Sequence, residues 1–197
     1  MNILILGNGG REHTFCWKLS QSPQHPTLFI APGNAGTAAL GTNLPISPTD
    51  FDAVAEAVSE NKIDLIVVGP EAPLVAGIHD FIVAHPTLSH IPVIGPKQEA
   101  AQLEGSKAYA KAFMERHNIP TAPYKQFTAD TLSAGLAYLE TIPAPYVLKA
   151  DGLAAGKGVM IIQDVEEAKA ALTDMLSNKK FGAASQQAAI EGFLVGL

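Results

Sequence analysis

The chain has 197 residues and a formal net charge of −6, which argues against non-specific binding to nucleic acid. Hydrophobic residues make up 47% and charged residues 16%, a balance that allows a packed core and is not typical of disordered proteins. No apolar run reaches the roughly 18 residues of a membrane span, and residues 1–6 lack the basic start of a signal peptide. The single cysteine, Cys16, allows no internal disulfide bond and indicates a reducing, cytoplasmic location.

The first half of the sequence alternates predicted strands and helices. Strands are predicted at residues 3–6, 27–31, 63–68 and 91–94 from short apolar runs, and helices at residues 10–19, 51–58 and 74–84. Thr49 and Asp52 form a predicted capping box in front of the second helix, whose apolar stripe has helical spacing. This alternation predicts a parallel sheet covered by helices on both faces, with ligands at the carboxyl ends of the strands.

Three glycine-rich turns follow these strands, at residues 7–13, 32–37 and 69–74. The first contains Gly7-Asn8-Gly9, but Glu12 occupies the place of the third glycine in a dinucleotide fingerprint. We therefore favour a phosphate site at the following helix N-terminus, where the guanidinium of Arg11 can also reach an anion. The alternative is that the glycines serve tight turns and nothing else.

The second half of the sequence has a different order of elements. A helix at 108–117 and a proline-containing linker at 119–123 lead to strands at 124–127, 146–150, 159–162 and 188–191, with helices at 131–139 and 165–176. The strands at 146–150 and 159–162 are joined by a short loop, which predicts an antiparallel hairpin. The change in the order of elements predicts a second, α+β unit that is distinct from the parallel domain before it.

The loop between these two strands is rich in glycine and lysine but is not a P-loop. Gly158 stands where a P-loop has a hydroxyl, and the loop joins two strands rather than a strand and a helix. Its glycines let backbone amides approach an anion closely. Lys149 is predicted to face the same side of its strand as Val147; the alternative for such a lysine is a surface position with its charge in solvent. The six histidines have no metal-binding spacing, and no cluster of acids predicts a metal site.

Five motifs in order resemble the phosphoribosylamine–glycine ligases (glycinamide ribonucleotide synthetases), ATP-grasp enzymes of purine biosynthesis. They are Gly-Asn-Gly-Gly-Arg-Glu-His at 7–13, Ala-Pro-Gly-Asn-Ala-Gly-Thr at 31–37, Val-Gly-Pro-Glu-Ala-Pro-Leu at 68–74, Gln-Leu-Glu-Gly-Ser-Lys at 102–107 and Lys-Ala-Asp-Gly-Leu-Ala-Ala-Gly-Lys-Gly-Val at 149–159. The resemblance implies an α/β fold: a Rossmann-like, parallel-sheet domain at 1–103 that precedes an incomplete α+β ATP-grasp domain. It divides the rest of the chain into a connecting helix and linker at 104–122, the flap subdomain at 123–191 and the start of a second ATP-grasp subdomain at 192–197. The sequence departs from the family pattern at Gly192 and Leu197, which stand where the family has acidic residues.

The resemblance also implies the site residues. The nucleotide would contact Lys107, Lys149, Asp151, Gly152, Gly156, Lys157, Gly158, Glu191, Phe193 and Leu194. Phosphoribosylamine would contact Gly9, Gly10, Arg11, Glu12, His13, Gly33, Asn34, Pro70 and Glu71. No residue of this chain is expected to be catalytic in itself, because amide formation through an acyl phosphate needs positioning and charge neutralisation rather than a nucleophilic side chain.

The implied partners are ATP, glycine and phosphoribosylamine, bound by a monomer, with Mg²⁺ or Mn²⁺ held by ligands beyond Leu197. Family members continue for about as long again, so this chain alone is expected to be inactive. Two other functions remain open at this stage: another ATP-grasp ligase or carboxylase of purine metabolism, and a non-catalytic nucleotide-binding module.

Overall fold

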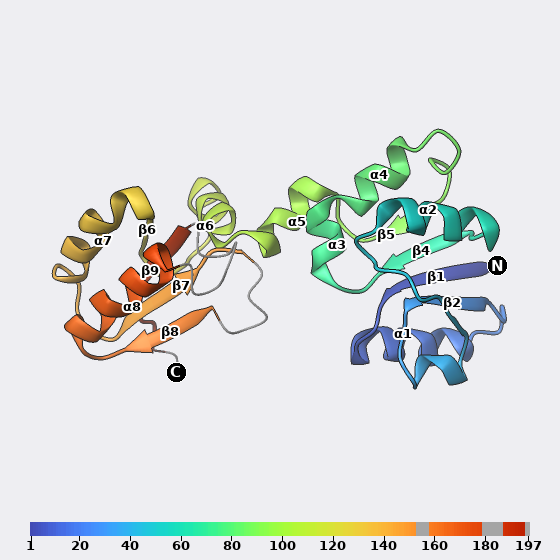
Figure 1. The fold of residues 1–197 in the computed structure, drawn as a ribbon, viewed down its shortest axis with the longest axis horizontal. Coiled ribbons are helices and arrows are strands. Elements are labelled where there is room, and N and C mark those ends of the chain that lie inside the picture. The colour runs from blue at the N-terminus through green and yellow to red at the C-terminus, as the bar shows by residue number, and fades with distance from the viewer. Residues whose placement is uncertain (153–157, 179–186, 196–197) are drawn as a thin grey trace. The chain divides into compact units, whose positions relative to one another are not determined.

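The computed structural model describes residues 1–152, 158–178 and 187–195. The chain divides into two compact units, Met1–Ala101 and Gln102–Leu197. In each unit, a sheet and the helices packed on it bring together segments that are distant in the sequence (Figure 1).

Unit 1 is built on a parallel sheet in the strand order β3-β2-β1-β4-β5. The strands are β1 (Asn2–Gly7), β2 (Thr27–Pro32), β3 (Thr42–Asn43), β4 (Leu65–Val68) and β5 (Val93–Ile94). The helices are α1 (Gly10–Ser20), the short η1 (Thr37–Ala39), α2 (Phe51–Glu60), α3 (Glu71–Ala76) and α4 (Ile78–Ala84). The predicted parallel sheet is therefore confirmed.

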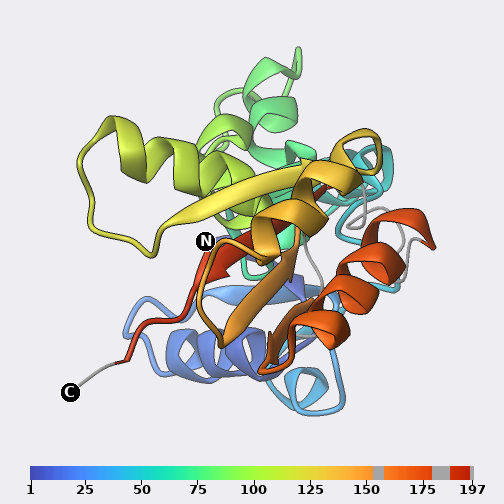
Figure 2. The same ribbon diagram turned by 90° about the vertical axis from the view of Figure 1, so that its left-hand side faces the viewer.

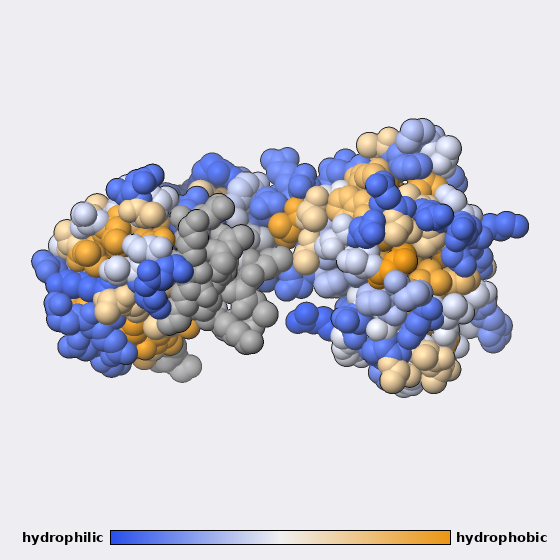
Figure 3. Space-filling model, in the orientation of Figure 1, coloured by the Kyte–Doolittle hydropathy of each residue, from blue (hydrophilic) through white to orange (hydrophobic). Residues whose placement is uncertain are grey.

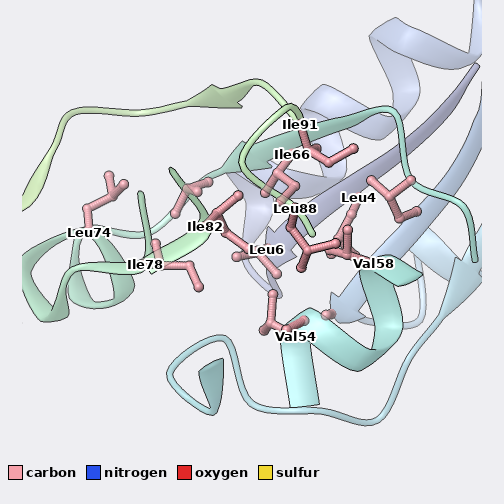
Figure 4. Close-up of a cluster of buried hydrophobic side chains, with 14 of the residues drawn as sticks. Leu4, Leu6, Val54, Val58, Ile66, Leu74, Ile78, Ile82, Leu88 and Ile91 are labelled. Carbon is pink, nitrogen blue, oxygen red and sulfur yellow. The ribbon is translucent and has the colours of Figure 1, made fainter. Parts of the chain in front are cut away.

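Successive side chains of the central strand β1 point to opposite faces of the sheet, and each face has its own core. Leu4 and Leu6 pack with residues of α2 and α4, in the buried cluster that Figure 4 shows around Val54, Ile78 and neighbouring side chains. On the other face, Ile3 and Ile5 pack with Cys16 of α1. Burial raises the pKa of the Cys16 thiol, so this residue behaves as a small apolar side chain.

Two local predictions in unit 1 are wrong in detail, and one strand was missed. The N-cap of α2 is Asp50, whose carboxylate accepts a hydrogen bond from the Ala53 amide, whereas Thr49 bonds to Ser47 instead of forming the predicted capping box. The helix expected at 74–84 is two helices, because Gly77 adopts a left-handed conformation with φ of 102°. Strand β3 was not predicted, since its two residues carry no apolar signal.

Unit 2 is built on an antiparallel sheet in the strand order β6-β9-β7-β8. The strands are β6 (Tyr124–Thr128), β7 (Tyr146–Ala150), β8 (Val159–Ile162) and β9 (Gln187–Gly192). The helices are α5 (Gln98–Gly105), which begins in unit 1 and was not predicted, then α6 (Lys107–Arg116), the short η2 (Ala129–Thr131), α7 (Leu132–Leu139) and α8 (Val165–Ser177). Strands β7 and β8 form the predicted antiparallel hairpin.

One face of this sheet forms the core of unit 2, and the other carries polar groups. Leu148 and Ile190 pack in the cluster formed with α7 and α8, which lie over the same face of the sheet (Figure 2). Residues at alternate positions, Val147, Lys149 and Glu191, point to the opposite face. Strand alternation therefore separates the core of unit 2 from the polar face on which its candidate site lies.

Much of the molecular surface in view is hydrophilic, with separate hydrophobic patches in each unit (Figure 3). Within the described residues, no helix has the length and apolar character required to cross a bilayer.

Leu4→Ala tests the parallel-sheet core. Leu4 is fully buried, so its truncation leaves a cavity, and we expect a loss of about 2–5 kcal/mol in the free energy of unfolding. Urea denaturation measures this loss, with Val83→Ala as the control because Val83 is 43% exposed. Equal effects of the two substitutions would contradict the assigned core.

Candidate functional sites

The loops that follow β1, β2 and β4 meet at the carboxyl ends of the strands. The Gly33 amide donates to the Gly7 carbonyl at 3.1 Å, and the Gly69 amide donates to the Leu6 carbonyl at 3.0 Å. The Asn34 side chain donates to the Asn8 carbonyl at 2.9 Å. The three glycine-rich turns singled out in the sequence therefore form one cluster.

Asn34 joins the first and second loops through both ends of its amide. Its Nδ2 donates to the carbonyls of the first loop, while its Oδ1 accepts from the amides of Gly36 and Thr37 at 2.8 and 3.1 Å. Asn43, from β3, donates to the Asn34 carbonyl at 2.8 Å and accepts from the Thr37 hydroxyl at 2.8 Å. Most of the hydrogen-bonding capacity of Asn34 thus holds the loop in shape.

Glu12 lies beneath the loops, not on their exposed surface. The residue is 4% exposed, and its Oε2 atom accepts a hydrogen bond from the Gly9 amide at 2.6 Å. A Cβ atom at Gly7 or at Gly69 would lie 2.6 Å from Glu12 Cγ. Only glycine leaves room for this carboxylate between the ends of β1 and β4, so Glu12 supports the loop cluster from below.

Unlike this carboxylate, the groups able to meet a ligand are exposed. Gly10 and Arg11 open α1, where amides of the first turn have no acceptor within the helix and the helix dipole is positive. The Arg11 side chain is exposed. The ring of His13 packs on Gly36, where an added Cβ would lie 2.7 Å from Nδ1. Such an arrangement can bind an anion.

Two more predicted residues follow β4. Pro70 is the N-cap of α3 and Glu71 is its first residue; both are half-buried. They extend the loop cluster at the end of β4, next to Gly69.

The polar face of unit 2 carries a carboxylate shared by two lysines. Lys149 Nζ of β7 lies 2.8 Å from Glu191 Oε2, and Lys111 Nζ of α6 lies 3.1 Å from the same oxygen. The register that places Val147 opposite Glu191 puts Lys149 diagonally across from this carboxylate. Lys149 therefore faces the same side as Val147, as predicted.

Glu191 has one oxygen with no partner. Its side chain is 5% exposed, and Oε1 is buried without a hydrogen bond to any part of the chain that the structure describes. An ionised carboxylate oxygen can accept hydrogen bonds but cannot donate them. Because leaving a buried acceptor unpaired is unfavourable, this atom indicates a place for a ligand that donates a hydrogen bond.

The near end of the glycine loop is fastened to the start of α6. Asp151 Oδ1 accepts a hydrogen bond from the Ala108 amide at 3.1 Å, and the Ser106 hydroxyl donates to Asp151 Oδ2 at 3.1 Å. Lys107 Nζ donates to the Gly152 carbonyl at 3.1 Å. Lys107, Asp151 and Gly152 are thus held together, and Asp151 acts as an anionic cap of the helix.

The remaining predicted nucleotide contacts lie in the loop after Gly152 and in the last residues of the chain. Gly156 and Lys157 lie outside the described residues, while the Gly158 carbonyl accepts a hydrogen bond from the Ala150 amide at 2.8 Å. Phe193 and Leu194 are 44% and 67% exposed. Nothing among their described contacts joins these two side chains to the Lys149–Glu191 pair.

Lys111 is the residue that sequence reasoning missed. It is the one buried lysine in the described part of the chain, at 7% exposed. In α6 it follows Lys107 by one helical turn. That spacing was the available signal, but it does not reveal burial or the partner on β9. Its ammonium lies 5.3 Å from the centroid of the Tyr124 ring. Burial, with a smaller effect of Glu115, raises the pKa of the Tyr124 phenol, which therefore stays neutral near pH 7.

No metal centre is formed by the described residues, which contain no group of three or more histidine, cysteine, aspartate or glutamate side chains able to hold an ion.

Solved structures share the fold of the chain. The phosphoribosylamine–glycine ligase from Thermotoga maritima is 32% identical, with a TM-score of 0.77, over 100% of this chain and 45% of its own. The N5-carboxyaminoimidazole ribonucleotide synthetase from Thermus thermophilus is 20% identical, with a TM-score of 0.69, over 98% of this chain and 47% of its own. The fold is that of ATP-grasp ligases.

Family models cover the whole sequence. The model described as phosphoribosylglycinamide synthetase, N domain, matches residues 1–104, and the one described as its ATP-grasp (A) domain matches residues 105–197. The chain therefore belongs to the phosphoribosylglycinamide synthetase family.

Curated relatives agree with this assignment. Proteins named phosphoribosylamine–glycine ligase from Escherichia coli O157:H7 and Vibrio cholerae are 51% and 48% identical to it over 100% of its length. The chain spans 45% of the length of each of these relatives.

Gly69→Ala tests the support that Glu12 gives to the loops. The new methyl group would overlap Glu12, which is enclosed by neighbouring glycines, so we expect a loss of about 1–3 kcal/mol in the free energy of unfolding. Gly10→Ala is the control, because no atom lies within 4 Å of its added Cβ. Urea denaturation of both variants measures the free energy of unfolding. An unchanged stability of Gly69→Ala would show that the loops do not depend on the packing of Glu12 against Gly69.

Proposed function

We propose that this chain supplies the phosphoribosylamine site and part of the nucleotide site of a phosphoribosylamine–glycine ligase. The reaction joins glycine to 5-phosphoribosylamine at the expense of ATP and gives glycinamide ribonucleotide, ADP and phosphate. Family membership and the names of the relatives support this proposal. The observation that carries it is the Glu191 oxygen that lacks a partner among the described residues, beside Lys149 on the polar face of the antiparallel sheet.

The residues of this face fit an adenine nucleotide. Glu191 Oε1 is a buried acceptor without a donor, and the exocyclic amine of adenine is a donor of the required kind. Lys149 and Lys107 supply positive charge for the phosphates, one from the sheet and the other from the start of α6. Gly152, Gly156, Lys157 and Gly158 would complete the cover of the phosphates, and Phe193 and Leu194 would pack near the base.

The loop cluster of unit 1 fits the phosphate of phosphoribosylamine. We assign the phosphate to the first amides of α1 and to Arg11, and the ribose to the surrounding loops. Asn34 and Glu12 hold these loops in place by the hydrogen bonds described above. Gly9, Gly10, Gly33, His13, Pro70 and Glu71 form the rest of the proposed surface.

The proposed chemistry needs charge neutralisation and positioning more than proton transfer. Glycine is activated as an acyl phosphate, and the amine of phosphoribosylamine displaces the phosphate. Lysines neutralise charge on the transferred phosphoryl group, and the two binding sites hold the reactants in orientation. We also propose Mg²⁺ or Mn²⁺ as a partner of the nucleotide, but assign no residue of this chain to the metal. A monomeric, cytoplasmic enzyme is the corresponding proposal for its state in the cell.

Lys149→Ala tests the nucleotide site in a ligase of the relatives' full length that begins with this chain. Losing a positive charge at the transferred phosphoryl group should lower kcat/KM for ATP by a factor of at least about 100, with little change in stability. The control is Lys169→Ala. Lys169 lies on α8, which covers the opposite face of the sheet, and pairs with the exposed carboxylates of Glu140 and Glu166. A fully active Lys149→Ala enzyme would rule out the assigned site.

Arg11→Ala tests the phosphoribosylamine site in the same protein. If Arg11 binds the ribose phosphate, its removal should raise KM for phosphoribosylamine about 10-fold or more and leave KM for ATP nearly unchanged. Lys18→Ala, at the other end of α1, is the matched control. An effect on ATP alone would mean that the loops of unit 1 bind a different substrate.

A further inference from the structure

The two lysines that share Glu191 differ in how many of their donors are engaged. An ammonium group has three N–H donors. Lys111 Nζ contacts three acceptors: Glu191 Oε2 at 3.1 Å, the Thr121 hydroxyl at 2.8 Å and the Ala122 carbonyl at 3.1 Å. Its side chain is 9% exposed. Lys111 therefore has no donor left for a ligand.

Lys149 is less engaged and more accessible. Among the described residues, its one hydrogen bond goes to Glu191 Oε2, at 2.8 Å, and its side chain is 29% exposed. Two of its donors make no hydrogen bond to the described residues. The two lysines thus meet at one oxygen but have different freedom to leave it.

The charges of the cluster make this difference important. If Lys149 were the sole counter-ion of Glu191, moving it toward a phosphate would leave a buried carboxylate unpaired, which is strongly unfavourable. With Lys111 in place, Glu191 keeps a fixed counter-ion when Lys149 moves. The carboxylate also stays in position, because Lys111 ties it to the segment at Thr121 and Ala122.

We propose that Lys111 is a positioning residue that acts as the permanent counter-ion of Glu191 and thereby frees Lys149 to bind nucleotide phosphates. This inference rests on the proposed function, because it assumes that phosphates bind near Lys149. It assigns Lys111 no contact with the nucleotide.

Lys111→Met removes the counter-ion while keeping an unbranched side chain of similar length. Lys149 then becomes the remaining cation at Glu191 and is retained there. In the full-length ligase, we expect Kd for ATP to rise at least about 10-fold, while Kd for adenosine, which has no phosphate, changes less than about 3-fold. Isothermal titration calorimetry measures both. A merely structural role would weaken the binding of both ligands alike.

The double variant Lys111→Met/Glu191→Gln adds a second test. An amide carbonyl can still accept a hydrogen bond but carries no charge to retain Lys149, so ATP affinity should return to within about 3-fold of that of Glu191→Gln alone. Lys169→Met is the control for loss of a lysine from unit 2 and should bind ATP like the wild type. A double variant that binds ATP as weakly as Lys111→Met does would overturn the proposal.

The wild-type protein gives a readout that does not depend on whether a variant folds. In ¹H–¹⁵N spectra of the lysine ammonium groups, addition of ATP should shift the Lys149 signal and leave that of Lys111 in place. A shift of Lys111 alone would overturn the proposal. Wild-type protein that binds no ATP would overturn the proposed function itself, whereas ATP binding unaffected by Lys111→Met would overturn this inference and leave the proposed function standing.

Discussion

The buried carboxylate of Glu191 is the constraint on which the polar face of unit 2 depends. A charge in this position must be paired, and the pairing draws together β7, β9 and α6, which come from distant parts of the chain. The same carboxylate cannot satisfy both of its oxygens from the described residues. The two oxygens of one side chain therefore differ: Oε2 joins three elements of the unit, and Oε1 is buried without a partner among the described residues.

A similar division exists in unit 1, although its charges are arranged differently. Glu12 and Asn34 form hydrogen bonds with the loops. The groups left exposed are the amides at the start of α1 and the Arg11 side chain. Side chains that are polar and close to a site are thus not all ligand contacts. In both units, buried polar groups are engaged with the chain itself, and more exposed groups lie beside them.

The sequence predicted the larger elements well because their apolar runs are continuous and bounded by glycine or proline. Prediction from the sequence failed where a single residue sets a helix boundary. Gly77 divides a helix in two, and Asp50 caps α2 in place of its neighbour Thr49. The family resemblance brought out Lys149 and Glu191, but their pairing depends on the register between β7 and β9. Lys111 escaped notice because its burial arises from contacts with β9 and the linker, which no local pattern encodes.

The strand order of unit 1 gives Glu12 a further consequence. The chain builds the sheet outward from β1 in one direction and then in the other, so the crevice used for ligands in such folds opens between β1 and β4. Glu12 occupies the space between Gly7 and Gly69 at this point, and it belongs to the first turn of α1. Its carboxylate therefore offsets part of the positive end of the helix dipole from within the protein. The attraction of this helix end for an anion then rests more on its free amides and on the exposed guanidinium of Arg11 than on the dipole.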